Sequence, residues 1–206
     1  MQKGEKRKQE LLQIAYRLFL EKGYENTSVE AIISAAKIAK GTYYYHFQSK
    51  EQMLEEVIGM MLEKESALAG AILASSLPIP QKIAGIIAAF HPGQEEMTIE
   101  DALNRPENLR MHDRIQRRLR AIIVPMLAEV TREGISAGLF HCDHISERVN
   151  MLMILSSALF DEGQHTPEDV AVFIDAAEKI LGAEQGAMAF IGQLIGPAHG
   201  AKEEHA

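Results

Sequence analysis

Apolar residues recur with the spacing of an α-helix along the whole chain, and no stretch alternates apolar and polar positions as a half-buried strand does. A first helix is predicted from about Glu5 to Lys22, because Leu11, Ala15 and Phe19 share one face while lysines and glutamines fill the other. Gly23 follows directly, and glycine is the residue that most often ends a helix. The pattern predicts an all-α protein.

Two short helices and the start of a longer one are predicted next. Thr27-Ser28-Val29-Glu30 has the order of a capping box and starts a helix that ends near Ala36. A third helix is expected from about Lys40 to His46, after a tight turn, and Ser49-Lys50-Glu51-Gln52 repeats the capping-box order. Three short helices arranged in this way are typical of a helix-turn-helix domain. We place that domain at residues 1–48 and a larger helical domain at residues 49–206.

The larger domain shows several further helical patterns. They are predicted at residues 83–90, 106–137, 149–160 and 166–182, with Pro125 as a kink in the second of these. A loop at residues 91–93, a last apolar segment at 187–195 and a frayed polar tail complete the chain.

The 149–160 stretch is apolar nearly all round, which on a helix indicates burial on more than one side. Paired with residues 166–182 and with a second copy of both, it would form the four-helix interface of a homodimer. An ordinary monomeric core is the alternative.

The composition indicates a folded protein in a reducing compartment. Of 206 residues 47% are hydrophobic, which is enough to build a core, and the single Cys142 excludes an internal disulfide framework. The charged N-terminus lacks the apolar segment of a signal peptide, and no stretch reaches the roughly 18 apolar residues of a membrane span. We therefore expect a soluble, cytoplasmic protein without a membrane partner.

The net charge of −8 argues against a nucleic-acid partner until its distribution is considered. Residues 1–50 hold nine Lys and Arg against five Glu, a net charge of +4, whereas the remaining residues hold 12 against 24, a net charge of −12. The basic N-terminal part and the acidic remainder are therefore expected to meet different partners.

The predicted third helix carries side chains that can contact DNA. In a helix-turn-helix domain the second of the paired helices enters the major groove while neighbouring groups bind phosphates. Lys40, Thr42, Tyr43 and Tyr44 are placed to face that groove, where they can reach base edges, a thymine methyl group or the backbone. Double-stranded DNA is the predicted partner, and the alternative is that the tyrosines only pack.

Two runs in this domain resemble the TetR family of bacterial transcriptional regulators over about residues 7–58. They are Phe19-Leu20-Glu21-Lys22-Gly23-Tyr24-Glu25-Asn26-Thr27-Ser28-Val29 and Gly41-Thr42-Tyr43-Tyr44-Tyr45-His46-Phe47-Gln48-Ser49-Lys50. The resemblance implies a larger domain that senses a small-molecule effector. It also implies residue roles: phosphate contacts from Thr27 and Ser28, groove contacts from Thr42, Tyr43 and Tyr44, and backbone contacts from Tyr45, His46 and Lys50.

The chain departs from the family pattern at two positions of the turn. Lys37 stands where the family usually has glycine, and Ala39 stands where it usually has a hydroxyl-bearing cap. The third helix is therefore expected to lack a side-chain cap, and Lys37 can add a phosphate contact. The core of the domain is expected to contain Ala15, Phe19, Val29, Ile32 and Phe47.

The larger domain offers candidates for an effector pocket but no motif. Apolar side chains on its other helices suit such a site, although a methionine stripe is usually core. The candidates are Phe90, Met111, Ile115, Ile122 and Met126.

Other classes of function have less support than a regulator. His141-Cys142-Asp143-His144 resembles a metal cluster, but zinc signatures need more than one such pair, so we predict no metal and no cofactor. No acid–base pair, nucleophile motif or phosphate-binding glycine loop supports a helical enzyme or carrier. A DNA-organising protein without an effector is disfavoured by the acidic larger domain. The leading hypothesis is a dimeric repressor that an effector releases from a pseudo-palindromic operator.

Overall fold

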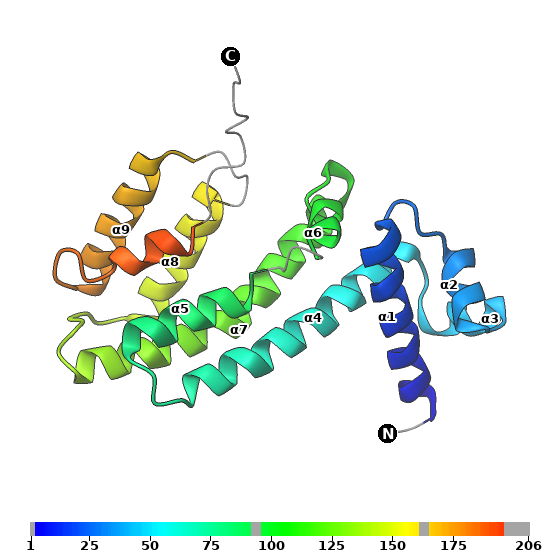
Figure 1. Ribbon diagram of the computed structural model, residues 1–206, viewed down its shortest axis with the longest axis horizontal. Coiled ribbons are helices and arrows are strands. Elements are labelled where there is room, and N and C mark those ends of the chain that lie inside the picture. Colours follow the sequence, from blue (N-terminus) through cyan, green and yellow to red (C-terminus); the bar gives the residue numbers. More distant parts are fainter. Residues whose placement is uncertain (1–2, 92–95, 161–164, 196–206) are drawn as a thin grey trace, which may run out of the picture. The chain divides into compact units, whose positions relative to one another are not determined.

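The computed structural model describes residues 3–91, 96–160 and 165–195, and these residues form helices joined by short connections (Figure 1). The all-α prediction is confirmed. In chain order the elements are α1 (Lys3–Lys22), α2 (Val29–Ala36), α3 (Lys40–His46), α4 (Lys50–Leu73), α5 (Ile79–Ala89), α6 (Met97–Leu103), the 3₁₀ helix η1 (Pro106–Asn108), α7 (Leu109–Ser136), α8 (Ile145–Phe160), α9 (Pro167–Leu181) and the 3₁₀ helix η2 (Ala189–Gln193).

The chain divides into two compact units, and two of the three divisions fall inside α4 and α7, while the third follows α5. The first unit comprises Met1–Glu65 and His91–Leu119, and the second comprises Ser66–Phe90 and Arg120–Ala206. Compact units do not by themselves show where DNA binding ends and sensing begins. The boundary at residue 48 between these two functions stays a prediction.

In the first unit, α1, α2 and α3 pack around a fully buried core. Phe19, Ile32, Tyr43 and Phe47 have no exposed surface, and neither has Ala15. The ring of Tyr43 on α3 and the ring of Phe47, the C-cap residue of that helix, lie 5.7 Å apart between centroids. Burial of each large apolar side chain contributes about 1.5–3 kcal/mol to stability. The predicted core is thus confirmed at four positions, while Val29 is only half-buried.

The second unit has a core of its own, formed by residues such as Ile86, Ile123, Val130 and Phe173. The start and end of α9 follow the predicted rules. Thr166 accepts from the Asp169 amide at 3.2 Å while the Asp169 carboxylate accepts from the Thr166 amide at 2.8 Å, which completes a capping box. At the other end Gly182 has a φ of 64°, the left-handed conformation that glycine adopts without a steric penalty.

The structure differs from the predicted elements in two places. Helix α6 was not predicted, and the helix expected from residue 106 begins as the 3₁₀ turn η1 before α7. The last apolar segment contains the 3₁₀ helix η2. Residues 92 and 93 of the predicted loop, and the polar tail, lie outside the described residues.

Pro125 lies inside α7, as predicted. None of the helices in the described part of the chain is long and apolar enough to cross a membrane.

Candidate nucleic-acid interface

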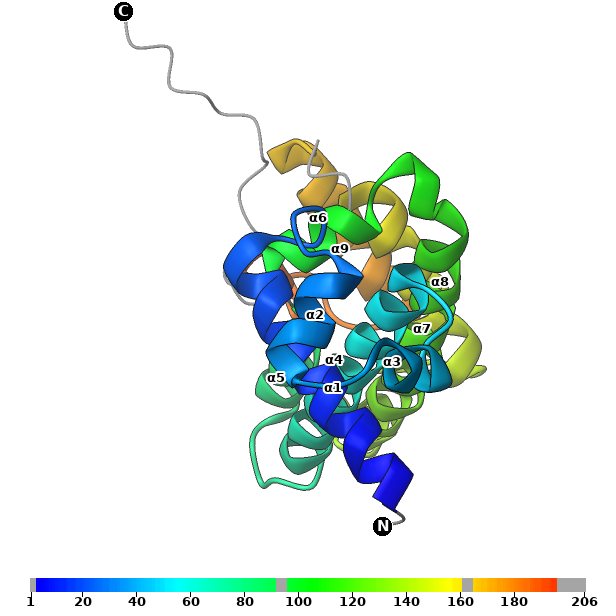
Figure 2. The same cartoon turned by 90° about the vertical axis from the view of Figure 1, so that its right-hand side faces the viewer.

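A tight turn joins α2 to α3, and Figure 2 shows both helices at the front of the view. Lys37 has φ 52° and ψ 47°, and its amide donates to the Ser34 carbonyl at 3.1 Å. The next amide, of Ile38, donates to the Ile33 carbonyl at 3.2 Å. These two bonds form a Schellman motif, which usually places glycine at the left-handed position. Lys37 therefore holds a conformation that costs a non-glycine residue about 1–2 kcal/mol.

Helix α3 buries one face and exposes the other. Tyr43 and Phe47 point into the core, whereas Tyr44 is 45% exposed and Tyr45 is 82% exposed. Lys40 and Gly41 are also exposed, and Thr42 and His46 are half-buried. Burial, with smaller contributions from Tyr44 and Glu51, raises the pKa of Tyr43 to about 12, so its hydroxyl stays protonated and lies 3.4 Å from the Ser49 carbonyl oxygen.

Two residues expected to touch DNA are buried in this structure. The Thr27 hydroxyl donates to the Gly23 carbonyl at 2.8 Å and lies 3.2 Å from the Leu18 carbonyl, and its side chain has no exposed surface. Tyr43 is equally buried. Their side chains join the end of α1 to the loop before α2, and α3 to the start of α4. Their contact with DNA stays a prediction.

Ser28, rather than Thr27 of the predicted capping box, is the N-cap of α2, so the capping box does not form. The Ser28 hydroxyl accepts from the Ala31 amide at 3.1 Å. The third residue of the helix is thus Ala31, and the Glu30 carboxylate lies 3.6 Å from the Lys40 ammonium instead. The exposed Ser28 hydroxyl remains available at the N-terminus of α2, where anions are favoured.

Lys50 is the first residue of α4, whose N-terminus is capped. Ser49 accepts from the Gln52 amide at 3.1 Å, and Gln52 accepts from the Gln48 amide at 2.7 Å. The Lys50 ammonium lies 4.1 Å from the centroid of the Tyr24 ring and 3.3 Å from the Glu25 carbonyl oxygen. A lysine at a helix N-terminus combines its charge with the helix dipole, which suits a phosphate.

The missing cap of α3 leads to a first prediction. Ala39 has the extended backbone of an N-cap residue (φ −73°, ψ 149°) but has no side-chain acceptor. Ala39→Ser is therefore expected to stabilise the protein by about 0.5–2 kcal/mol, measured as a higher urea midpoint. Ala35→Ser, at an exposed position inside α2, is the matched control and should not stabilise. Equal shifts in both variants would contradict a cap effect.

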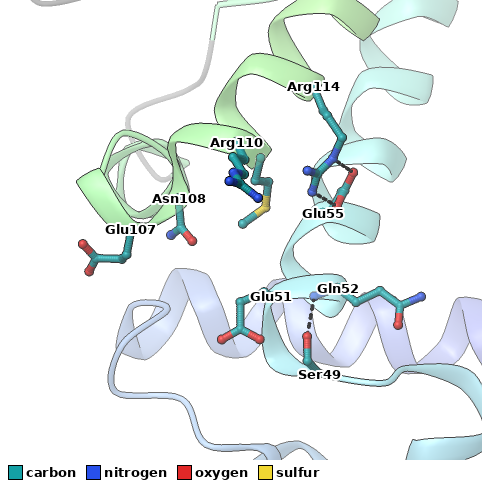
Figure 3. A pocket seen from close by; sticks show the side chains of 9 residues that line it. Ser49, Glu51, Gln52, Glu55, Glu107, Asn108, Arg110 and Arg114 are labelled. Atoms are coloured by element: carbon teal, nitrogen blue, oxygen red, sulfur yellow. Dashed lines mark hydrogen bonds and ion pairs between the residues drawn. The ribbon is translucent and has the colours of Figure 1, made fainter.

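A polar hollow of about 310 Å³ lies within the first unit (Figure 3). Glu55 and Arg114 face each other at one side, joined by hydrogen bonds of 3.0 and 2.7 Å that hold the pKa of the Glu55 carboxyl below its usual range. The lining residues are Ser49, Glu51, Gln52, Glu55, Glu107, Asn108, Arg110, Met111 and Arg114.

The predicted effector residues belong to both units of the chain. Met111 lines the hollow and Ile115 is buried in the same unit, whereas Phe90, Ile122 and Met126 belong to the second unit and are half-buried. The five residues therefore stay a prediction.

The His141–His144 segment makes structural contacts. Arg148 donates to the Asp143 carboxylate at 2.8 Å and to the Ile180 carbonyl at 2.6 Å, and burial raises the pKa of the half-buried Cys142 thiol. Among the residues that the structure describes, no three His, Cys, Asp or Glu side chains gather as metal ligands do.

A capped α2, a Schellman turn and an α3 with one buried and one exposed face, next to a lysine at the start of α4, define a helix-turn-helix DNA-binding protein. Residues 11–57 match the model of the bacterial regulatory proteins of the tetR family. The HTH-type transcriptional repressor KstR2 of Mycolicibacterium smegmatis is 31% identical over 142 residues, which cover 66% of this chain and 69% of that protein. The chain therefore belongs to the TetR family of DNA-binding transcriptional regulators, a family that is not enzymatic, as predicted.

Solved structures show the same fold over nearly the whole chain. RolR in complex with resorcinol has a TM-score of 0.62 and 18% identity, and covers 94% of this chain and 95% of its own. A TetR-family regulator from Mesorhizobium loti has a TM-score of 0.59 and 18% identity, and covers 88% of this chain and 98% of its own. At these identities the likeness concerns the fold alone.

Proposed function

We propose that the protein is a repressor that binds a pseudo-palindromic operator as a homodimer and leaves it when a small molecule binds. The observation that carries this proposal is the pair of unlike faces of α3, which buries Tyr43 and exposes Lys40, Tyr44 and Tyr45. A KstR2 relative is named a repressor, and RolR was solved with a small aromatic ligand, which supports repression and effector sensing. Such a regulator works in the cytoplasm.

The proposed DNA contacts follow exposure and chemistry. Lys40, Thr42 and Tyr44 face the groove, and Ser28, Tyr45, His46 and Lys50 bind phosphates. Thr27 and Tyr43 hold these residues in place. Phe90, Met111, Ile115, Ile122 and Met126 remain the candidates for contact with an effector, whose binding shifts the dimer towards an arrangement that does not fit the operator.

Dimerisation is supported by apolar surface on α8 and α9. Met151, Ile154 and Leu155 on α8 are 54%, 47% and 40% exposed, and Val172 on α9 is 67% exposed. In a monomer these side chains would face water, and contiguous exposed apolar surface marks an interaction site. In a dimer, α8 and α9 of each protomer would cover the exposed apolar side chains of the other. The dimer would then carry two copies of α3, as an operator with two half-sites requires.

Selection of genomic fragments at about 0.15 M salt tests the function. Recovery of a short inverted repeat is expected. Recovery of fragments without a common sequence would contradict a sequence-specific repressor and favour a protein that organises DNA.

Two substitutions separate phosphate contact from base contact. Lys50→Met is expected to weaken binding to every duplex and to reduce the salt slope by about one per protomer, because one released counterion per phosphate is lost. Thr42→Ala is expected to change the ranking of operator variants with less effect on the salt slope. Titrations of the selected duplex and its single-base variants over a range of salt measure both. The same uniform loss from both variants would defeat the assignment.

A further inference from the structure

The loop that joins α1 to α2 holds the Lys50 side chain from two sides. The ammonium lies 4.1 Å from the Tyr24 ring centroid and 3.3 Å from the Glu25 carbonyl oxygen. A cation over an aromatic face is attracted by the ring quadrupole, and an ammonium carries three N–H donors. One N–H of the Lys50 ammonium is directed to the Glu25 carbonyl, and the Tyr24 ring covers another side of the ammonium. Donor capacity therefore remains for an oxygen of a phosphate.

Tyr24 is itself fixed in place. Its side chain is 5% exposed, and its ring meets the edge of Phe19 at 5.3 Å between centroids. Its carbonyl accepts from the Thr27 amide at 3.1 Å, so the loop is closed on itself. Burial, followed by the charges of Glu51 and Glu25, raises the pKa of Tyr24 above the ordinary value for tyrosine, at which the ring is already neutral at physiological pH. A buried, neutral ring offers a rigid surface to the ammonium.

The backbone carbonyl and the side-chain carboxylate of Glu25 have different partners. Its carbonyl oxygen faces Lys50, while its carboxylate lies 3.1 Å from the Arg105 guanidinium. The carboxylate is therefore paired with Arg105 rather than with Lys50. A Lys50–Glu25 ion pair would have to be broken before a phosphate could bind.

A free lysine has a long flexible side chain, and ordering it on DNA costs conformational entropy. A side chain that is already placed loses less on binding. We propose that Tyr24 is a positioning residue that, together with the Glu25 carbonyl, presents the Lys50 ammonium to a DNA phosphate before the complex forms. The inference rests on the proposed function of Lys50 as a phosphate contact.

Tyr24→Leu and Tyr24→Phe, each with Lys50 and with Lys50→Met, test the proposal on the full-length protein with the selected duplex. Tyr24→Leu removes the ring face and is expected to weaken binding about three- to tenfold. Tyr24→Phe keeps the ring face and should change binding less than about twofold. In the Lys50→Met background, Tyr24→Leu should cost nothing further, since the cation that the ring positions is absent.

A spectroscopic readout separates positioning from a general structural role. In the free protein the Lys50 ammonium lies over the Tyr24 ring, so the protons of the neighbouring Cε are expected to be shifted upfield in the NMR spectrum. The shift should persist in Tyr24→Phe and vanish in Tyr24→Leu. An equal loss of affinity from Tyr24→Leu in both Lys50 backgrounds, or an unshifted Lys50 signal in the parent protein, would overturn the proposal. Lys50→Met binding as well as the parent would instead remove the phosphate contact on which the proposal rests, and the proposal with it.

Discussion

A glutamate in place of Ile154 is expected to separate the proposed homodimer into monomers and to lower affinity for an operator with two half-sites by about a hundredfold or more. Ile154 is 47% exposed on α8, beside Leu155 and within the same apolar face as Met151. A charge at the centre of a packed interface loses its hydration without gaining a partner, which an association of moderate strength does not survive. Sedimentation equilibrium and titration of the selected operator measure the two effects.

Leu139→Glu is the matched control for this substitution. Leu139 is 43% exposed, so a similar apolar surface is replaced by the same charge, but the residue lies in the connection between α7 and α8. The Leu139→Glu protein should remain a dimer and bind the operator normally. If Ile154→Glu also sediments as a dimer, the exposed face of α8 and α9 does not form the interface.

The second large effect concerns Gly182→Ala, which is expected to destabilise the protein by about 3 kcal/mol. Gly182 has a φ of 64°, and a Cβ there would overlap the His141 carbonyl oxygen and lie 2.9 Å from the His141 carbonyl carbon. A backbone hydrogen bond holds the His141 backbone close to Gly182, because the His141 amide donates to the carbonyl of the preceding residue, Leu181, at 3.0 Å. Backbone rather than a flexible side chain would have to move. Urea denaturation followed by circular dichroism measures the loss.

Gly138→Ala separates the two causes of that loss. Gly138 has a φ of 75°, but nothing lies within 4 Å of a Cβ built on it. The control therefore carries the left-handed penalty alone, about 1–2 kcal/mol. If the two variants are equally destabilised, the contact between Gly182 and His141 contributes nothing.

The sequence was sufficient to predict the helix-turn-helix elements because their signals are local. The hydroxyl of Ser28, the turn after Ala36 and the hydroxyl of Ser49 act on amides within a few residues, and the structure has helices where these signals predict them. The resemblance to the TetR family was carried by the same short window.

The direction of individual side chains was harder to predict. Tyr43, Tyr44 and Tyr45 are consecutive and chemically identical, so composition does not show which of them is buried; the position of Phe47 four residues after Tyr43 is the signal that could have decided it. Thr27 precedes the true cap by one residue, and its inward direction depends on the end of α1.

Non-local features were beyond the sequence pattern. Helix α6 has only seven residues, too few for an apolar stripe to repeat. The predicted effector residues Phe90 and Met111 belong to different units. The sequence could not show this, because the spacing of residues along separate helices does not indicate which helices pack together. Tyr24 lay inside the family resemblance, but its contact with Lys50 joins residues 26 positions apart and has no local signal.

If the exposed residues of α3 read the operator, as proposed, the DNA preference of this chain can change without loss of the fold. The buried side chains of Tyr43 and Phe47 pack α3 against the core, whereas Tyr44 and Tyr45 are exposed and contribute little to the core. Substitutions at the exposed positions leave the free energy of unfolding nearly unchanged, because surface changes usually stay within about 0.5 kcal/mol. New operator preferences can therefore arise in evolution, or be selected in the laboratory, without an intermediate variant that fails to fold.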